Sequence, residues 1–414
     1  MLKYTDLRKG LNIENMNGNA EDLAFFTHYL HNHINGVSKS FEKRAKKYYK
    51  TISDDLNIVS EPELQAMLPL IWDIPFPSPE KSEFTFIDLF AGIGGFRIPM
   101  QEIGGKCVFS SEFNYHAQRA YELNFGEVPF GDITKLNLEI VPKHNVLCAG
   151  FPCQPFSISG KMKGFEDTRG TLIYNVFKII EKREPEVVLL ENVKHLIYHD
   201  EKRTLSTIVK HLEGLGYIVS KKVLNASDFG VPQNRERIII IGHKKKKFDF
   251  SKLKTVQKPI LKDFLDKKND FEYLDEPYTI LDEMKTQVSG LIFAGYRNKT
   301  IRKAGVRSGT EHLSRVHKQP NRIYSTEGVH PALPSQESSG RFWILHKDKV
   351  RKLTIQECYK IMGFPKEFKL INNRSELYRQ VGNSVAIPMI KEVASQIKQQ
   401  LITSIQIKDA EYIS

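Results

Sequence analysis

From Phe84 onward, four short apolar runs alternate with segments that are long enough to form helices. The runs are FTFIDLF, KCVFSSEF, NVLCAGF and EVVLLENV. Strands regularly separated by helices form βαβ units, which build a parallel sheet with helices on both faces. We therefore predict an α/β fold with a doubly wound, mostly parallel sheet, whose ligands bind at the carboxyl ends of the strands.

Two later apolar runs, YIVSKKVLN and RERIIIIG, are joined by SDFGVPQN. This connection is too short for a helical crossover, so the two strands are predicted to be antiparallel and to end the sheet as a hairpin. Residues 351 to 402 return to helical periodicity.

Residues 1 to 80 differ from the sheet-forming part because they contain amphipathic helical stretches. The clearest stretch runs from Lys39 to Leu56, and its apolar face is formed by Phe41, Ala45, Tyr48, Tyr49, Ile52 and Leu56. The rest of this helix carries Lys43, Arg44, Lys46, Lys47 and Lys50, which form either a solvated face or a DNA contact. The proline-rich segment IPFPSP at 74–79 predicts a linker, after which a new domain begins.

The charge of the chain is strongly basic and points to a polyanionic partner. It has 414 residues with 61 Lys and Arg against 49 Asp and Glu, a net charge of +12. The best candidate for a nucleic-acid surface is the run RNKTIRKAGVRSGTEHLSRVHKQPNR, with a single acid, Glu311. Its basic residues are Arg297, Lys299, Arg302, Lys303, Arg307, Arg315, Lys318 and Arg322.

Several classes of protein are disfavoured. We find no apolar run that could span a membrane and no secretory signal at the start, so we expect a soluble intracellular protein. The four cysteines show neither disulfide nor zinc-ligand spacing, so no metal site is expected.

The first strand leads into a glycine-rich turn, Ala91-Gly92-Ile93-Gly94-Gly95, followed by a helix near Phe96. Such a turn lets a ligand approach the backbone, although the glycines could also serve close packing alone. The next strand ends in Glu112, where an acid takes ribose hydroxyls in doubly wound nucleotide sites. Asp132, at the end of a presumed third strand, could bind an adenine amino group or cap a loop. Together these positions predict a nucleoside cofactor.

The strand NVLCAGF ends in a turn that contains Pro152, Cys153 and Pro155. A thiol held on a stiff, exposed turn suits a nucleophile, whereas Cys148 lies within the apolar run and is predicted to be buried. The strand after it ends at Glu191, which places a carboxylate beside the cysteine turn.

The motifs DLFAGIGGFR, GFPCQPFS, ENV, QNRERI and QVGNSV, in that order, resemble the signature motifs of the cytosine-5 DNA methyltransferases. The resemblance runs from about Phe84 to the last helix and is weakest between Lys258 and Lys349. It implies that Cys153 is the catalytic nucleophile, that Glu191 engages the base and that Arg235 and Arg237 line the cytosine pocket. The implied cofactor, S-adenosylmethionine, would contact Phe90, Gly92, Gly94, Gly95, Glu112, Phe113, Asp132, Ile133, Leu172 and Asn383.

The chemistry of this family explains these residue types. A thiolate that adds to carbon 6 of cytosine makes carbon 5 electron-rich enough to accept a methyl group. A proton or hydrogen bond from Glu191 stabilises the adduct if burial raises the pKa of this acid. The target base must first rotate out of the duplex.

The segment after Cys153 is predicted to be a loop that closes over DNA, although a rigid connector remains the alternative. Its contacts would come from Ser159, which helps fill the vacated space, and from Lys161, Lys163 and Arg169 on phosphates. In the recognition region, Arg297, Arg302, Arg307, Arg315 and Arg322 are the candidates for DNA contact.

The helical pattern and the proline-rich linker predict an N-terminal extension (1–80), which the resemblance does not cover. The resemblance implies a catalytic and cofactor domain (81–257), a target-recognition region (258–349), a return segment (350–380) and a C-terminal helix (381–414). We expect a bacterial, cytoplasmic enzyme of a restriction-modification system that acts as a monomer on double-stranded DNA. The run GTEHLSRVHKQPNRIYS resembles recognition regions for GGNCC or GGWCC sites. Two alternatives stay open: a tRNA cytosine-5 methyltransferase, and a DNA-binding transcriptional regulator acting through the N-terminal extension.

Overall fold

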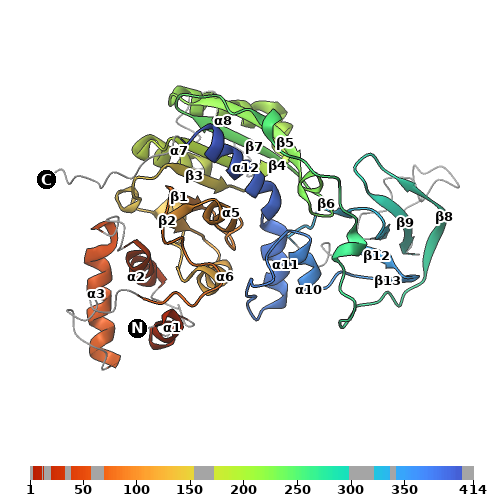
Figure 1. Cartoon of the computed structure of the whole chain (residues 1–414), viewed down its shortest axis with the longest axis horizontal. Helices are drawn as coiled ribbons and strands as arrows, with labels where there is room; N and C mark the ends of the chain where they lie inside the picture. Colours follow the sequence, from red (N-terminus) through yellow and green to blue (C-terminus); the bar gives the residue numbers. More distant parts are fainter. Residues whose placement is uncertain are drawn as a thin grey trace.

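The computed structural model describes residues 3–11, 13, 20–32, 39–56, 70–152, 172–297, 321–335 and 342–402. Three parts follow one another across the molecule: N-terminal helices, a helix-covered sheet, and a lobe rich in strands (Figure 1).

The central six-stranded sheet has the order β2-β1-β3-β4-β7-β5. Its strands are β1 (Phe84–Leu89), β2 (Gly105–Ser111), β3 (Val146–Gly150), β4 (Val187–Val193), β5 (Ile218–Asn225) and β7 (Glu236–His243). Strands β1 to β4 are parallel, and β7 runs antiparallel to both β4 and β5. The predicted fold class and the terminal β5–β7 hairpin are thus confirmed.

The prediction of a third strand before Asp132 is wrong, because this segment does not form a strand of the sheet. Phe130 forms only an isolated bridge with Ser111, and the third parallel strand is β3. The ladder with β2 stops there because the N–H of Val128 donates to Thr27 Oγ1 and the carbonyl of Val108 accepts from Asn32 Nδ2, so these two backbone groups do not pair with each other.

Both faces of the central sheet are buried by helices. The helices are α5 (Arg97–Glu102), α6 (Tyr115–Phe125), α7 (Leu172–Arg183), α8 (Arg203–Gly214) and α12 (Ile387–Gln400). Side chains alternate along β3: Leu147 joins a core with α7 and α8, whereas Cys148 joins the opposite core with α5 and α12 (Figure 1). Burial on both faces explains why these strands are almost continuously apolar. The prediction that Cys148 is buried is confirmed.

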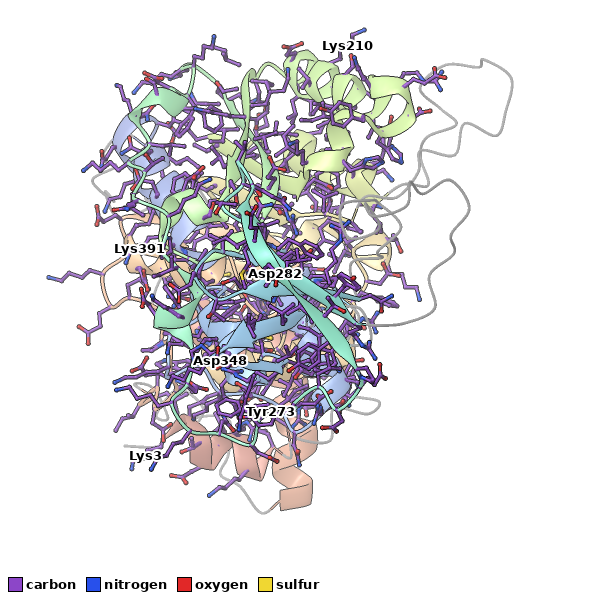
Figure 2. All side chains as sticks on the ribbon, turned by 90° about the vertical axis from the view of Figure 1, so that its right-hand side faces the viewer. Lys3, Lys210, Tyr273, Asp282, Asp348 and Lys391 are labelled. Carbon is purple, nitrogen blue, oxygen red and sulfur yellow. The ribbon has the colours of Figure 1, made fainter. Side chains whose placement is uncertain are left out.

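A second, five-stranded sheet of order β13-β12-β10-β9-β8 forms the lobe between 278 and 351. Its strands are β8 (Tyr278–Thr286), β9 (Ile292–Arg297), β10 (Arg322–Ser325), β12 (Trp343–His346) and β13 (Lys349–Arg351). Figure 2 views the molecule from the side of this lobe, with Asp282 of β8 toward the viewer.

Two short strands join the lobe to the central sheet. Strand β6 (Gln233–Asn234) pairs in parallel with β11 (His330–Pro331). Helices α10 (Ile355–Lys360) and α11 (Arg374–Asn383) then lead the chain back to the central sheet (Figure 1). A short ladder therefore connects the motif QNRERI at 233–238, called the arginine motif below, directly to the predicted recognition region.

The N-terminal helices pack onto the central sheet and share its hydrophobic core. They are α1 (Tyr4–Gly10), α2 (Ala20–Asn32) and α3 (Lys39–Leu56). On the predicted apolar face of α3, Phe41, Ala45, Tyr48 and Tyr49 are buried, which confirms that part of the face. The side chains of Ile52 and Leu56 lie outside the described ones.

Helix α2 covers the open edge of the sheet at β2. Asn32 Nδ2 donates to Val108 O at 3.3 Å, and His28 Nε2 accepts from the backbone N–H of Ser110 at 3.1 Å. Edge strands present unpaired backbone groups to solvent, and burial of such groups without partners is costly. Side chains of α2 therefore replace a neighbouring strand at this edge.

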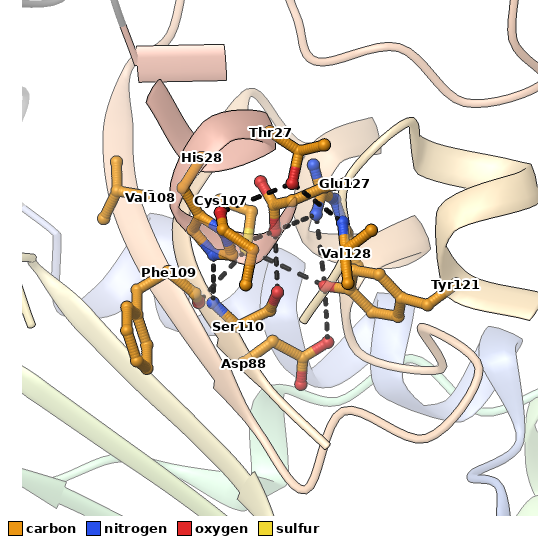
Figure 3. A network of polar contacts seen from close by, with 12 residues as sticks. Thr27, His28, Asp88, Cys107, Val108, Phe109, Ser110, Tyr121, Glu127 and Val128 are labelled. Atoms are coloured by element: carbon orange, nitrogen blue, oxygen red, sulfur yellow. Dashed lines mark hydrogen bonds and ion pairs between the residues drawn. The ribbon is translucent and has the colours of Figure 1, made fainter. Parts of the chain in front are cut away.

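A buried polar network links α2 to the start of α5 (Figure 3). At its centre, Glu127 Oε1 accepts from Arg97 Nη1 at 2.8 Å and from Ser110 Oγ at 2.7 Å, and lies 3.4 Å from His28 Nε2. Burial raises the pKa of Glu127, but the charge of Arg97 lowers it to about 2. Glu127 is therefore an anion that compensates the charge of the fully buried Arg97.

We predict that Glu127→Ala destabilises the protein strongly because it leaves the Arg97 guanidinium buried without its carboxylate. The free energy of unfolding in urea should fall by about 3–5 kcal/mol. Glu139→Ala is the matched control, since it removes an exposed carboxylate paired with Lys182 and should change the free energy little. Equal stability of the two variants would contradict a compensating role for Glu127.

Candidate active site

A cavity of about 890 Å³ opens at the carboxyl ends of the parallel strands. It is lined by the segments that follow β1, β2 and β3, by the end of β4, by 333–335 from the recognition region and by residues at the end of α11. The predicted residues that line it are Phe90, Gly92, Gly95, Glu112, Phe113, Asp132, Ile133, Leu172, Glu191, Arg235, Arg237 and Asn383. The cavity lies at the edge of the sheet where we predicted the ligand site.

The glycines of the turn after β1 serve different purposes. Gly92 has a φ of +55°, and a Cβ built there would meet nothing closer than Phe90 O at 3.9 Å, so its surface faces open space. Gly94 does not line the cavity, and a Cβ there would lie 2.2 Å from the ring of Phe125. At Gly94 the glycine is therefore required for close packing against Phe125, as the alternative interpretation held, whereas Gly92 leaves room for a ligand.

The acids after β2 are held in place by the backbone. Glu112 Oε2 accepts from the N–H of Gly92 at 2.8 Å, and its Oε1 accepts from the N–H of Asn114 at 2.7 Å. Burial raises the pKa of Glu112, while these backbone donors oppose the shift. Asp132 Oδ1 caps the following 3₁₀ helix by accepting from the N–H of Thr134 at 2.9 Å. Asp132 thus does act as a cap, and it also lines the cavity.

Phe113 stands out because its side chain is 79% exposed although it is a large apolar residue. It lines the same cavity as Glu112, Ile133 and Leu172. A solvent-facing ring at a cavity wall offers a flat surface on which a heteroaromatic group can stack.

Glu191 and Arg237 form a buried ion pair at the opposite end of the cavity. Glu191 is directly opposite Gly150 in the parallel β3–β4 pairing, which places its carboxylate beside the end of β3. Arg237 Nε lies 2.9 Å from Glu191 Oε1. Burial raises the pKa of Glu191, opposed by the charges of Arg237 and Arg235. This acid therefore holds a proton more readily than an exposed glutamate does.

Arg235 is buried more deeply, with 1% of its surface exposed. Its guanidinium donates to three backbone carbonyls: Nη1 to Leu333 O at 3.0 Å, and Nη2 to Gly382 O at 2.7 Å and to Ser384 O at 2.6 Å. The two arginines of the motif therefore differ, because Arg237 pairs with the acid of the site and Arg235 binds the backbone of two distant segments.

Several predicted site residues lie outside the described residues. These are Cys153, Ser159, Lys161, Lys163, Arg169, Arg302, Arg307 and Arg315. Pro152, immediately before the cysteine, lines the cavity. In the strand-rich lobe, Arg297 ends β9 and forms an ion pair with Glu276, and Arg322 begins β10, opposite Tyr296.

Sequence reasoning missed the contribution of α11 and of the recognition region to the cavity. Arg379 and Gln380 line it, and both amide atoms of the buried Gln380 have no hydrogen-bond partner among the described residues. Leu333, Pro334 and Ser335 line it as well. The motif QVGNSV was the available signal for Gln380, whereas the segment 333–335 carries no motif.

The fold and the cavity define a class of protein, the methyltransferases with a doubly wound sheet that bind S-adenosylmethionine at the carboxyl edge. The family described as C-5 cytosine-specific DNA methylase matches residues 84–399. The chain belongs to this family. It is therefore a DNA (cytosine-5-)-methyltransferase, and its methyl donor is S-adenosylmethionine.

Curated relatives agree with this assignment. The chain is 42% identical over 328 residues to the Type II methyltransferase M.DsaV of Dactylococcopsis salina, covering 77% of this chain and 87% of the relative. It is 39% identical over 383 residues to the Type II methyltransferase M.HpaII of Haemophilus parainfluenzae, covering 85% and 98%. Among solved structures, the Dnmt2 methyltransferase of S. pombe aligns with a TM-score of 0.56 at 18% identity, covering 76% of this chain and 99% of that one, which supports the fold.

No helix in the described part of the chain combines the length and apolar character that crossing a membrane requires.

We predict that alanine at Gly92 and at Gly94 has different effects. Gly94→Ala should lower the free energy of unfolding by about 1–3 kcal/mol because the methyl group meets Phe125. Gly92→Ala should weaken the binding of S-adenosylhomocysteine, measured by titration calorimetry, because its methyl group enters cavity space, and its φ of +55° should add a smaller loss of stability. Gly131→Ala is the stability control, since a Cβ there meets no atom within 4 Å. Wild-type affinity in Gly92→Ala would contradict the assignment.

Proposed function

We propose that this enzyme methylates carbon 5 of one cytosine within a specific sequence of double-stranded DNA, as a monomer, after the base has rotated out of the helix. We also propose that it is the modification enzyme of a bacterial restriction-modification system and protects cytoplasmic host DNA from a cognate endonuclease. The names of its relatives, Type II methyltransferases, support this role. The observation that carries the catalytic part is the buried Glu191–Arg237 pair in the same cavity as the predicted cofactor residues.

The cavity residues fit the chemistry of the methyl donor. S-adenosylmethionine, when bound, supplies an activated methyl group on its sulfonium. We propose that the oxygens of Glu112 accept from the ribose hydroxyls, that Phe113 stacks on the adenine, and that Asp132 accepts from its amino group. Gly92 and Gly95 would allow close approach to the backbone, and Phe90, Ile133, Leu172 and Asn383 would complete the walls. Gly94 is left out of this set because of its packing.

The base would occupy the end of the cavity that contains Glu191. Addition of the Cys153 thiolate to carbon 6 places negative charge on ring nitrogen 3 and on the carbonyl oxygen. Glu191, with its raised pKa, can donate a proton or hydrogen bond to the nitrogen, and the Arg237 guanidinium can stabilise the oxygen. Such charges stabilise the adduct best in a site from which water is excluded, and this requires that the base leave the stack.

The two alternative functions have less support. A tRNA substrate is disfavoured because the family that matches residues 84–399 is described as a DNA methylase. A purely regulatory role does not explain the buried acid of the cavity. The basic face of α3 remains a candidate DNA contact beside catalysis, as do the predicted loop contacts of Ser159, Lys161, Lys163 and Arg169.

We predict site-specific methylation that depends on Cys153. Plasmid DNA incubated with the enzyme and S-adenosylmethionine, then mapped by bisulfite conversion, should show 5-methylcytosine at one recurring sequence. This map also tests the proposal that the recurring sequence is GGNCC or GGWCC. Cys153→Ser should abolish the signal because serine does not form the required nucleophile, while binding to the same DNA should persist. Methylation by Cys153→Ser would overturn the proposed mechanism.

We also predict that Glu191→Gln lowers kcat by about 10²–10⁴-fold because it removes a proton donor from the adduct. Burial raises the pKa of Glu191, so the wild-type proton donor is lost as pH rises through that pKa, and the variant should lack this alkaline decline. The affinity for S-adenosylhomocysteine should be unchanged. Glu201→Gln, on an exposed carboxylate, is the matched control. A near-normal kcat in Glu191→Gln would contradict its role.

A further inference from the structure

Arg235 makes contacts that a role in binding the base does not explain. Three of its five N–H donors bind the carbonyls of Leu333, Gly382 and Ser384, and its Nε has no partner among the described residues. Burial and the neighbouring charge of Arg237 lower the pKa of Arg235, opposed by Glu191. Arginine nevertheless stays charged in proteins, so the carbonyl dipoles stabilise a buried cation.

The first of these carbonyls belongs to the end of the recognition region. Both backbone groups of Leu333 are bound by the arginine motif, since its N–H donates to Gln233 Oε1 at 3.1 Å and its carbonyl accepts from Arg235. Leu333 follows β11, which pairs with β6 beside Arg235. The position of this segment is therefore set by two side chains of the central domain.

The other two carbonyls flank Asn383, a predicted cofactor residue. The turn around Asn383 also contacts the glycine-rich turn after β1, because a Cβ at Gly95 would lie 2.7 Å from Ser384 Oγ. It contacts the recognition segment as well, because a Cβ at Gly382 would lie 2.1 Å from Pro334 O. Segments far apart in sequence therefore meet around one guanidinium.

We propose that Arg235 is a positioning residue that joins the end of the recognition region to the turn around Asn383, so that binding of DNA and binding of the cofactor reinforce each other. DNA held by the recognition region fixes the segment at Leu333, and Arg235 passes this restraint to the cofactor turn. By thermodynamic reciprocity, the cofactor strengthens DNA binding by the same factor. This inference rests on the proposed function, because it requires a DNA site and a cofactor site on either side of Arg235.

The test uses titration calorimetry to measure the affinity for S-adenosylhomocysteine with and without a short DNA duplex. The duplex contains the target sequence identified by the bisulfite map. In the wild type, we expect DNA to tighten this binding by about 5-fold or more. Arg235→Met removes the hydrogen-bond donors but keeps an unbranched side chain. We expect the coupling factor, which is the ratio of the affinities with and without DNA, to fall below about 2-fold. Should Arg235→Met fail to fold, Arg235→Lys is the second variant, because it keeps the positive charge on a side chain that has fewer donors. Its coupling factor should fall below half that of the wild type.

Arg183→Met is the matched control, because Arg183 also donates to two carbonyls, those of Leu138 and Glu139, but lies outside the cavity lining. It should lower the thermal stability while the coupling factor stays at the wild-type value. The inference would be overturned by a folded Arg235 variant whose coupling factor equals that of the wild type. It would also be overturned if DNA did not change the affinity of the wild type for S-adenosylhomocysteine. Failure of the proposed function is seen separately, as absence of 5-methylcytosine from the mapped plasmid.

Discussion

The in-register parallel pairing of β3 with β4 is the constraint on which the site depends. It places Glu191 opposite Gly150, at the end of the strand that leads to Pro152 and the cysteine turn. A buried carboxylate costs several kcal/mol unless a partner compensates it. The antiparallel neighbour β7 supplies that partner, because its Arg237 is opposite Val193 and ion-pairs with Glu191. The site therefore needs both the parallel strands and the reversed hairpin beside them.

The same edge explains why one cavity can serve two ligands. Carboxyl ends of parallel strands meet at one side of a sheet, so the acid after β2 and the acid at the end of β4 open into one space. The glycine-rich turn lies between them and leaves room because Gly92 carries no side chain. If the methyl donor and the base bind as proposed, their proximity follows from the strand order and requires no additional element.

Much of this arrangement could be predicted from the sequence. The apolar runs predicted the parallel sheet, and the short connection predicted the β5–β7 hairpin. The end of the second strand indicated Glu112, and the motifs indicated Glu191 and Arg237. The prediction of a strand before Asp132 was wrong because the N–H of Val128 donates to the distant Thr27 instead of to β2, which the local sequence does not show. The roles of Gly94 and Arg235 were not predictable, since they depend on Phe125 and on carbonyls about 100 and 150 residues away. The strand-rich lobe has small cores, such as that of Ala294, Ile323, Trp343 and Val350, and short strands that leave little periodicity to detect.

The N-terminal helices illustrate the same limit and bear on the regulatory alternative. Periodicity identified the apolar face of α3, but it could not reveal that α2 replaces a strand at the edge of β2. Because the buried charge of Arg97, immediately after the glycine-rich turn, is compensated by Glu127 beside His28 of α2, the extension is coupled to the cofactor edge through a continuous polar network. Separating the extension from the central sheet would expose both the edge of β2 and the polar network around Glu127. If the extension binds DNA through the basic face of α3, it therefore does so as part of the catalytic domain.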